Sequence, residues 1–192
     1  MRHVQHPPSN RDIIDEARHS VGATSHIPNW LEDRLSQLAD SEIVDFGSHF
    51  DECRNTAYDA RLWLAAVVLL RGCGDDSFDY FRAWLIAQGR KVFDAALVDP
   101  DSLAELGHFD ADPRLEEMLY VDTHAYLKRL GRGRHDLEAI KQYEALQPQR
   151  TRPALQRPEL LDASDEDAAK LYPKLAARFP SGVLWLSPNE KA

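Results

Sequence analysis

The sequence predicts an all-α protein that forms one compact multi-helix domain. Apolar residues recur at steps of three and four along most of the chain, and this spacing places them on one face of an α-helix. No segment shows the strict alternation of apolar and polar residues that is typical of a half-buried strand. The chain has 192 residues, of which 43% are hydrophobic. It is therefore long enough for one buried core and too short to require two full domains.

The chain begins with a polar, proline-containing segment, residues 1–8, which we expect to be disordered. Ser9 is a candidate N-cap for a first helix, over 9–18. Pro28 suits the start of a second helix, because proline lacks the backbone N–H that is unsatisfied at that position.

The centre of the chain supplies the predicted core. A helix over 40–58, capped by Asp40 or Ser41, carries the clearest apolar stripe, and the segment 61–71 is almost entirely apolar. Periodicity alone allows a strand or a buried helix over 61–71, but the alanines within it and the lack of a partner strand favour a helix. Gly72 is expected to end that helix. Three further core helices are predicted over 76–88, 90–98 and 113–130.

The C-terminal region is predicted to add a helix and a tail to this core. A core domain over 9–147, which ends with a helix from Asp136 to Leu146, is followed by a proline- and arginine-containing linker, 148–158. The last helix begins at Ser164 and must end near Pro173, because proline disfavours helix in the residue before it. We expect the region 159–192 to pack back on the core through its apolar residues: Leu175, Phe179, Val183, Leu184 and Trp185.

Composition excludes some classes of function. The chain carries 23 basic and 32 acidic residues, a net charge of −9, whereas a general binder of nucleic acid or of anionic membranes needs a positive surface. The longest apolar run, 62–70, is about half the ~20 residues of a membrane-spanning helix. Two cysteines without zinc-type spacing, and no secretory signal at the N-terminus, indicate a cytoplasmic protein.

Charge is unevenly distributed along the chain. Residues 128–157 contain eight basic and three acidic residues, so this segment could dock a phosphate or an acidic partner. Pairing with the acidic remainder of the same protein is the more common explanation.

The stretch from Gly72 to Gly89 concentrates glycines, acidic residues and aromatics. Asp75, Asp76 or Ser77 is expected to cap the 76–88 helix, since carboxylates are favourable at a helix N-terminus. Beyond that structural role, two readings of Arg82 stay open. It lies between aromatic residues of an apolar helix, so it either pairs with a carboxylate inside the protein or, together with Asp76, contacts a partner.

Other candidate chemistry is sparse. His49 and Cys53 are four residues apart and so share a helix face, with Asp45 nearby and His124 as a possible fourth ligand from another helix. Because Cys53 belongs to the apolar stripe and no established metal, nucleotide or hydrolase motif occurs, we predict neither a metal site nor a cofactor.

The stretch from Gly72 to Gly89, continuing through 99–104, resembles the bacterial family called domain of unknown function 4240. The resemblance extends over about 9–130 and includes His49-Phe50-Asp51-Glu52, Leu62-Trp63 and Glu116-Glu117-Met118-Leu119-Tyr120. It implies no established activity, although some members carry a label as regulators of molybdenum metabolism and some are fused to a WGR module. The family's most characteristic positions correspond here to Asp75, Asp76, Phe78, Phe81, Arg82, Trp84, Gln88 and Gly89.

Two hypotheses of function follow. The first is a non-enzymatic binding or regulatory module that recognises a protein or peptide partner through the 72–89 motif. The second is a small accessory biosynthetic or modifying enzyme that uses Asp75 and Asp76 with His49 or Arg82. The candidate binding residues are Asp75, Asp76, Arg82, Gln88, His49 and Trp84. Catalytic residues and oligomeric state are left open.

Overall fold

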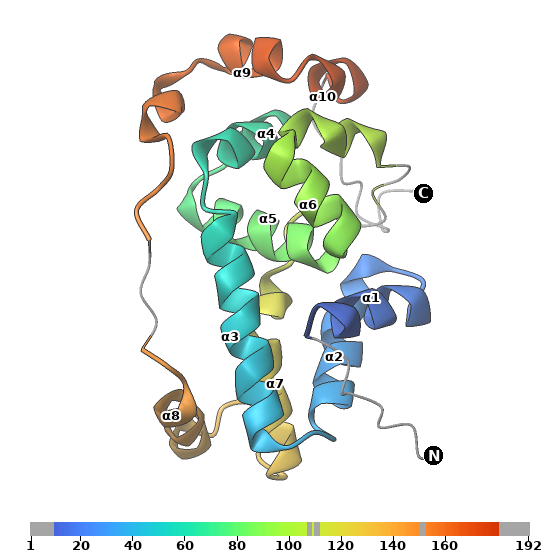
Figure 1. Cartoon of the computed structure of the whole chain (residues 1–192), viewed down its shortest axis with the longest axis vertical. Coiled ribbons are helices and arrows are strands. Elements are labelled where there is room, and N and C mark those ends of the chain that lie inside the picture. Colours follow the sequence, from blue (N-terminus) through green and yellow to red (C-terminus); the bar gives the residue numbers. More distant parts are fainter. Residues whose placement is uncertain (1–9, 107–108, 110–111, 150–152, 181–192) are drawn as a thin grey trace, which may run out of the picture.

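Helix α3 (Asp40–Thr56) runs along the long axis of the molecule beside α7 (Val121–Arg129) (Figure 1). Helices α1 (Asn10–Ser20), α2 (Ile27–Leu35), α5 (Asp75–Ala87) and α8 (Leu137–Leu146) pack on this pair. The computed structural model describes residues 10–106, 109, 112–149 and 153–180. α2 covers α7, and α1 packs on both α2 and α3. α5 crosses the C-terminal half of α3. The core lies where these helices meet.

The remaining elements complete the all-α architecture. They are α4 (Ala60–Leu70), α6 (Arg90–Val98), α9 (Asp165–Leu171), α10 (Pro173–Arg178) and the 3₁₀ turns η1 (Thr24–His26), η2 (Pro100–Glu105), η3 (Glu116–Tyr120) and η4 (Pro158–Asp162). The described residues contain no strand, and Asp59 and Gln156 form an isolated β-bridge. The predicted all-α fold class is confirmed.

The apolar segment predicted as a buried helix forms α4. Asp59 is its N-cap and accepts a hydrogen bond from the backbone N–H of Arg61 at 2.9 Å. Arg71, at φ 57°, and Gly72, at φ 126°, turn the chain out of the helix in the left-handed region. Seven of its eleven residues are buried, so the tertiary environment favours helix where periodicity alone was ambiguous.

Two predicted N-caps are displaced by one residue. α3 begins at Asp40 with Ala39 as N-cap, and the carboxylate of Glu42 accepts a hydrogen bond from the Ala39 N–H at 2.9 Å. α5 begins at Asp75 with Gly74 as N-cap, in place of Asp75, Asp76 or Ser77. In both cases the acidic residue lies in the first turn of the helix, where it still faces the positive end of the helix dipole.

The predicted 113–130 helix starts later than expected. Asp112 does not cap a helix at Pro113, because its carboxylate forms an ion pair with Arg114. The backbone N–H of Leu115 donates instead to the carbonyl oxygen of Tyr80 in α5, at 3.1 Å. This tertiary bond holds the chain in an extended turn, so η3 begins at Glu116 and α7 at Val121.

The C-terminal helices α9 and α10 lie at the end of the molecule opposite α8, over α4 (Figure 1). Two carboxylates of the core, those of Asp101 and Asp59, bind the C-terminal region. Asp101 accepts hydrogen bonds from the N–H groups of Lys174 and Leu175, at 3.1 and 2.9 Å, and so caps α10 from η2. Tyr172 donates to the carbonyl oxygen of Arg61 at 2.8 Å. The chain does pass from α9 to α10 at Pro173, as the proline predicts.

Asp59 is the second carboxylate that holds the C-terminal region. Its side chain is 5% exposed and pairs with Arg61 at 3.0 Å and with Arg157. The Gln156 backbone bonds to both neighbours of Asp59, through Ala60 N–H to Gln156 oxygen at 3.0 Å and Gln156 N–H to Tyr58 oxygen at 3.2 Å. Residues 156 and 157 of the predicted extended linker are thus in contact with the core.

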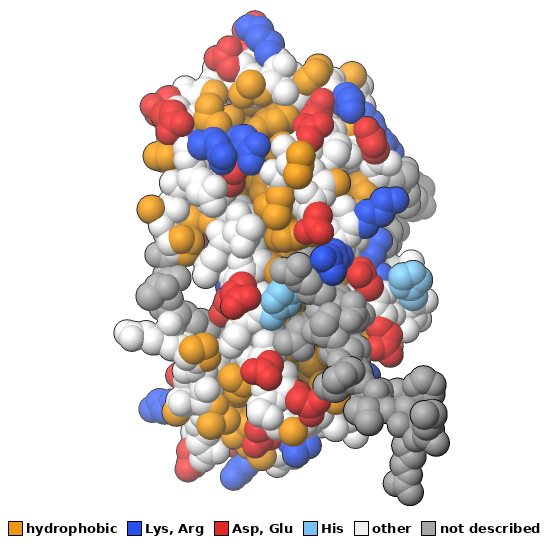
Figure 2. Space-filling model, in the orientation of Figure 1, with side chains coloured by type: hydrophobic (Ala, Val, Ile, Leu, Met, Phe, Trp, Pro, Cys, Tyr) orange, Lys and Arg blue, Asp and Glu red, His pale blue; other side chains and the backbone are white. Residues whose placement is uncertain are grey.

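Basic side chains of the 128–157 segment pair with the protein's own acids. Arg129 contacts Asp40 at 2.7 Å and Arg134 contacts Glu32 at 2.6 Å, each pairing the segment with an acid from α2 or α3. Lys128 likewise pairs with Asp33. On the face drawn in Figure 2, acidic and basic side chains are interspersed. The explanation by internal pairing therefore accounts for much of the charge asymmetry.

Some predictions concern residues outside the described part of the chain. These are the disorder of residues 1–8, the cap at Ser9 and the packing of Val183, Leu184 and Trp185. Leu175 and Phe179 are described; Leu175 is fully buried and the Phe179 ring contacts Phe109 edge-on at 5.1 Å. Within the described residues, no helix combines the length and apolar character needed to cross a bilayer.

We predict that Asp59→Asn lowers the free energy of unfolding at pH 7 by about 1–3 kcal/mol, because it removes the buried anion that pairs with two partly exposed arginines. Burial opposes ionisation of Asp59, but hydrogen bonds from Arg61 and Arg157 outweigh it and lower the carboxyl pKa. A lowered pKa means that ionised Asp59 stabilises the fold above pH ~4 and that this contribution is lost as the pH falls further.

The measurement is urea denaturation of wild type and Asp59→Asn at pH 7 and pH 3. The difference in unfolding free energy between the two proteins should shrink at pH 3, where the wild-type carboxyl is increasingly protonated. An unchanged difference would contradict the assigned role of the charge.

Candidate functional site

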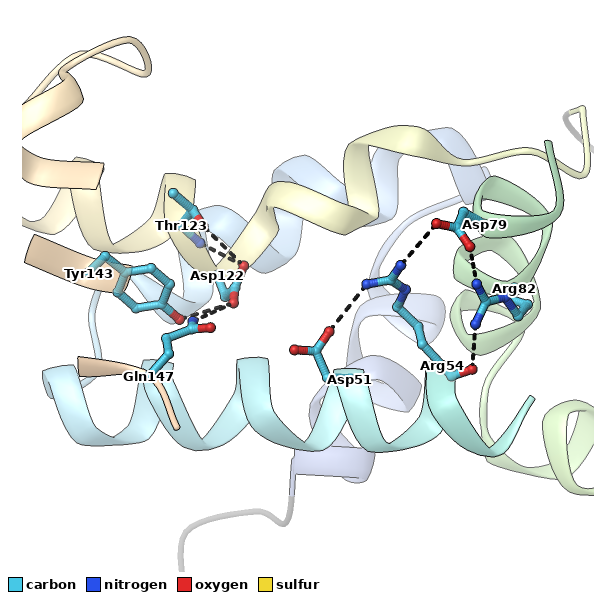
Figure 3. A network of polar contacts seen from close by, with 8 residues as sticks. All are labelled: Asp51, Arg54, Asp79, Arg82, Asp122, Thr123, Tyr143 and Gln147. Carbon is cyan, nitrogen blue, oxygen red and sulfur yellow. Dashed lines mark hydrogen bonds and ion pairs between the residues drawn. The ribbon is translucent and has the colours of Figure 1, made fainter. Parts of the chain in front are cut away.

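Arg82, the motif residue with two open readings, is inside the protein. It is 2% exposed, and its Nη1 donates to the carbonyl oxygen of Arg54 at 2.7 Å, while Nη2 pairs with Asp79 (Figure 3). The guanidinium lies over two aromatic rings, 4.8 Å from the centre of Tyr58 and 5.0 Å from that of Phe78. Of the two interpretations left open by the sequence, Arg82 therefore matches the first, which is pairing with a carboxylate inside the protein.

A second arginine extends this pairing to the middle of α3. Arg54 contacts Asp51 at 3.2 Å and Asp79 at 3.4 Å, so aspartate and arginine alternate along a row that passes from α3 to α5 (Figure 3). Their formal charges cancel, which is the condition under which buried ions are tolerated. The network fixes the C-terminal end of α3 against α5.

Gln88 and Trp84 are also buried at 8% and 2% exposure. Gln88 accepts a hydrogen bond from Arg18 of α1 at 3.0 Å and donates to the carbonyl oxygen of Trp84 at 3.3 Å. The next residue, Gly89, has φ 83°, and a Cβ there would lie 2.3 Å from a carboxylate oxygen of Asp15. The end of the motif thus serves the packing of α1 on α5. Trp84 belongs to an aromatic row: Phe78, Phe81, Trp84, Phe109 and Phe179.

Asp75 and Asp76 are the motif residues that face solvent. Both are exposed in the first turn of α5. Tyr80 follows Asp76 by one helical turn and is half-buried. Burial, the carboxylate of Glu116 and that of Asp76 together raise the pKa of Tyr80, whose hydroxyl is within hydrogen-bonding reach of Glu116. Tyr80 therefore connects the exposed end of α5 to η3.

Beside Tyr80 and η3 the surface is hollowed. We call this hollow the acidic groove; it has a volume of about 550 Å³, opens to solvent, and is formed by α2, η3, α7 and the loop after α7. Its lining residues are Pro28, Asn29, Glu32, Glu116, Glu117, Tyr120, Val121, His124 and Arg134.

Negative charge exceeds positive charge around the groove. Arg134 pairs with Glu32 at 2.6 Å, so these two charges offset each other. Asp76, Glu116 and Glu117 are exposed, and the described part of the chain places no cation in an ion pair with them. Arg114, the nearest cation along the chain, is paired with Asp112. A cationic group entering the groove would meet unbalanced carboxylates.

His124 is the titratable group inside the groove. It stacks on Tyr120 at 5.9 Å and its Nδ1 lies 3.9 Å from Glu32. Burial and the nearby Arg134 lower its pKa below the ordinary 6.5, against the opposing influence of Glu32 and Asp122. His124 is thus mainly neutral at pH 7 and gains a positive charge on acidification.

The structure does not bring His49 to Asp75 and Asp76. His49 lines a different, largely apolar hollow together with Ile86 and Gly89 at the C-terminal end of α5. Ile86 follows Asp76 by ten residues of sequence, a separation of about 15 Å along a helix. The constellation of Asp76 with His49 is therefore not assembled. Within the described residues no three His, Cys, Asp or Glu side chains are grouped to hold a metal ion.

Residues 12–128 match the sequence family described as Protein of unknown function (DUF4240). The chain belongs to this family. The match spans α1 to α7, so both the arginine–aspartate network and most of the acidic groove lie within the DUF4240 region, whereas Arg134 and the C-terminal helices lie beyond it. Comparison with curated proteins and with solved structures found no match.

Most residues of the acidic groove are not among the candidate binding residues that the sequence predicts. Glu116, Tyr120 and His124 follow one another at steps of four, a spacing that places them on one helical face and that could have been recognised. Asp76 and Tyr80 have the same spacing. Glu32 comes from α2 and carries no signal in the sequence that links it to His124. Only the packing of α2 on α7 joins them.

We predict that Arg82→Met lowers the free energy of unfolding by about 3–5 kcal/mol, because it leaves Asp79 and Arg54 without their buried partner. Arg90→Met is the matched control, since the Arg90 side chain is 58% exposed and its loss should change stability by less than about 0.5 kcal/mol. Urea denaturation of both variants measures the difference. Similar losses in the two would contradict a structural role for Arg82.

Proposed function

We propose that this DUF4240 protein is a non-enzymatic binding or regulatory module that recognises a protein or peptide partner, and that the recognised segment is basic. The binding surface begins at Asp75 and Asp76, passes over Tyr80 and enters the acidic groove. The observation that supports this most directly is the pair of exposed carboxylates that line the groove, Glu116 and Glu117, with the exposed Asp76 near them beside Tyr80.

The chemistry of the groove suits lysine or arginine side chains. Carboxylates at its rim attract the cation, and Tyr120, 45% exposed, presents an aromatic ring on which a cation or an alkyl stem can rest. The hydroxyl of Tyr80 and the imidazole of His124 add hydrogen-bonding groups. Rim charges of this kind contribute mainly to association rate and to discrimination between partners.

The alternative function, a small accessory enzyme, requires Asp75 and Asp76 to lie close to His49 or Arg82, and the described residues do not have this arrangement. Arg82 is committed to Asp79 and Arg54. Asp76 is in the first turn of α5, whereas His49, from α3, lines the hollow at the C-terminal end of α5. We therefore propose the binding module and do not propose catalysis by Asp75 and Asp76.

We predict that the triple variant Asp76→Asn/Glu116→Gln/Glu117→Gln weakens binding of a Lys-Ser repeat peptide about tenfold, since each lost exposed charge contact contributes about 0.5 kcal/mol. The matched control is Glu138→Gln/Glu144→Gln/Glu159→Gln, which changes the net charge equally at exposed positions of α8 and η4. Fluorescence anisotropy with labelled Lys-Ser and Glu-Ser peptides measures affinity. Equal weakening in both triple variants would contradict recognition at the groove.

We also predict that affinity for the Lys-Ser peptide falls as the pH is lowered from 7 through the lowered pKa of His124, because the imidazole then gains a positive charge. Affinity falls because the positively charged imidazolium repels the lysine side chains of the peptide. His124→Gln should bind almost equally at pH 7 and at the lower pH. The same anisotropy titration, run at both, tests this, and an identical pH-dependent loss in the variant would assign the effect to other groups.

A further inference from the structure

A second surface, separate from the acidic groove, places a thiol next to an imidazole. Three residues of α3, at relative positions one, four and five, form a short row. The Nδ1 of His49 lies 3.5 Å from a carboxylate oxygen of Glu52, and its Nε2 lies 3.6 Å from the Sγ of Cys53. The imidazole thus stands between a carboxylate and a thiol.

The ionised Glu52 carboxylate lies on the Nδ1 side of the imidazole. A proton on Nδ1 faces this carboxylate favourably, and the tautomer that carries it leaves Nε2 as an acceptor. Nε2 is then an acceptor directed to the thiol of Cys53. A nucleophile, a base and a group that orients the base are thereby arranged in the order that activated nucleophiles require.

This pair lines a hollow at the edge of the packed core. The hollow has a volume of about 430 Å³ including its open mouth, and it lies between α1, α3, α5 and α6. Apolar side chains form most of its wall: Ile14, Phe46, Phe50, Ile86 and Phe93. At the rim Arg90 and Asp94 pair with each other at 3.5 Å, so they add no net charge.

We propose that Cys53 is a nucleophilic thiol, with His49 as its base, that accepts a short apolar acyl group from a thioester in this hollow. The apolar wall suits a hydrocarbon chain, and because most of the hollow's volume belongs to its open mouth, a long enclosed chain does not fit. Nothing in the acidic groove is needed for this activity, so it is independent of the binding function proposed above.

The step is a thiol–thioester exchange and involves no oxidation or reduction. The Cys53 proton passes to Nε2 of His49 while the sulfur attacks the carbonyl carbon of the thioester. A new bond forms between that carbon and Cys53, and the bond from the carbon to the departing sulfur breaks. The proton then passes from His49 to the departing thiolate, which leaves as a thiol.

Cys73 provides a control within the same molecule. It is half-buried in the loop between α4 and α5, and burial raises the pKa of its thiol to about 12, against the influence of Arg114. Because the thiolate is the reacting species, Cys73 should be nearly inert at pH 7. A rise in its reactivity would report unfolding of a variant.

The experiment uses the full chain and reads both cysteines by peptide mass spectrometry. The probes are iodoacetamide and the acetyl, butyryl and decanoyl thioesters of N-acetylcysteamine, at pH 7. We predict that iodoacetamide modifies Cys53 about 100-fold faster than Cys73, and that acetyl and butyryl thioesters acylate Cys53 faster than the decanoyl thioester does.

The variants distinguish whether His49 acts as a base or has only a structural role. His49→Gln should slow both reactions of Cys53 about 100-fold while Cys73 stays inert. Glu52→Gln, at a side chain that is 77% exposed, should slow them about fivefold, as expected for a residue that orients the base. His26→Gln, at an exposed histidine of η1, should have no effect.

Three results would overturn the proposal. One is a Cys53 rate no greater than that of Cys73. Another is an unchanged Cys53 rate in His49→Gln. The third is fast modification by iodoacetamide without acylation by any of the thioesters, which would show a reactive thiol that does not take acyl groups.

Discussion

A guanidinium that is cut off from water must find its counter-charge within the protein, and Arg82 finds it in Asp79 and in the backbone of Arg54. Desolvating a cation is costly, so these partners have to be held in place, and α3 and α5 are fixed relative to each other as a result. The rings of Tyr58 and Phe78 close the site on its other sides. Both surfaces discussed above include α5 or elements that contact it, so their geometry depends on this junction.

Helix α5 separates two different chemistries. Its N-terminal half packs on η3, which forms part of the acidic groove, and its C-terminal end, with Ile86, borders the apolar hollow at Cys53. A helix of 13 residues spans about 20 Å. A ligand in one place therefore does not touch the other, and coupling between the two would have to pass through the helix itself or through the arginine–aspartate network.

The sequence predicts the helices well because apolar spacing reports burial on one helical face, as along α3 and α4. It predicts fewer of the features of the candidate sites. The exposure of Asp75 and Asp76 follows from their place in a first turn, whereas the burial of Arg82 depends on a backbone oxygen 28 residues away, which no local pattern reveals. The start of α7 was missed for the same reason, since the N–H of Leu115 bonds to Tyr80. Contacts between distant segments set these features.

The C-terminal helices are attached to the rest of the protein mainly through α4 and η2. Their polar attachments include Asp101 to the first turn of α10, Tyr172 to the carbonyl oxygen of Arg61 and Lys174 to Glu105. Asp59 holds residue 157, which precedes them along the chain. Such a unit can detach as a whole while α3, α5 and α7 stay folded, because its opening exposes less surface than global unfolding. The amide hydrogens of α9 and α10 would then exchange with solvent independently of those of α3, α5 and α7. This opening would expose α4 to solvent.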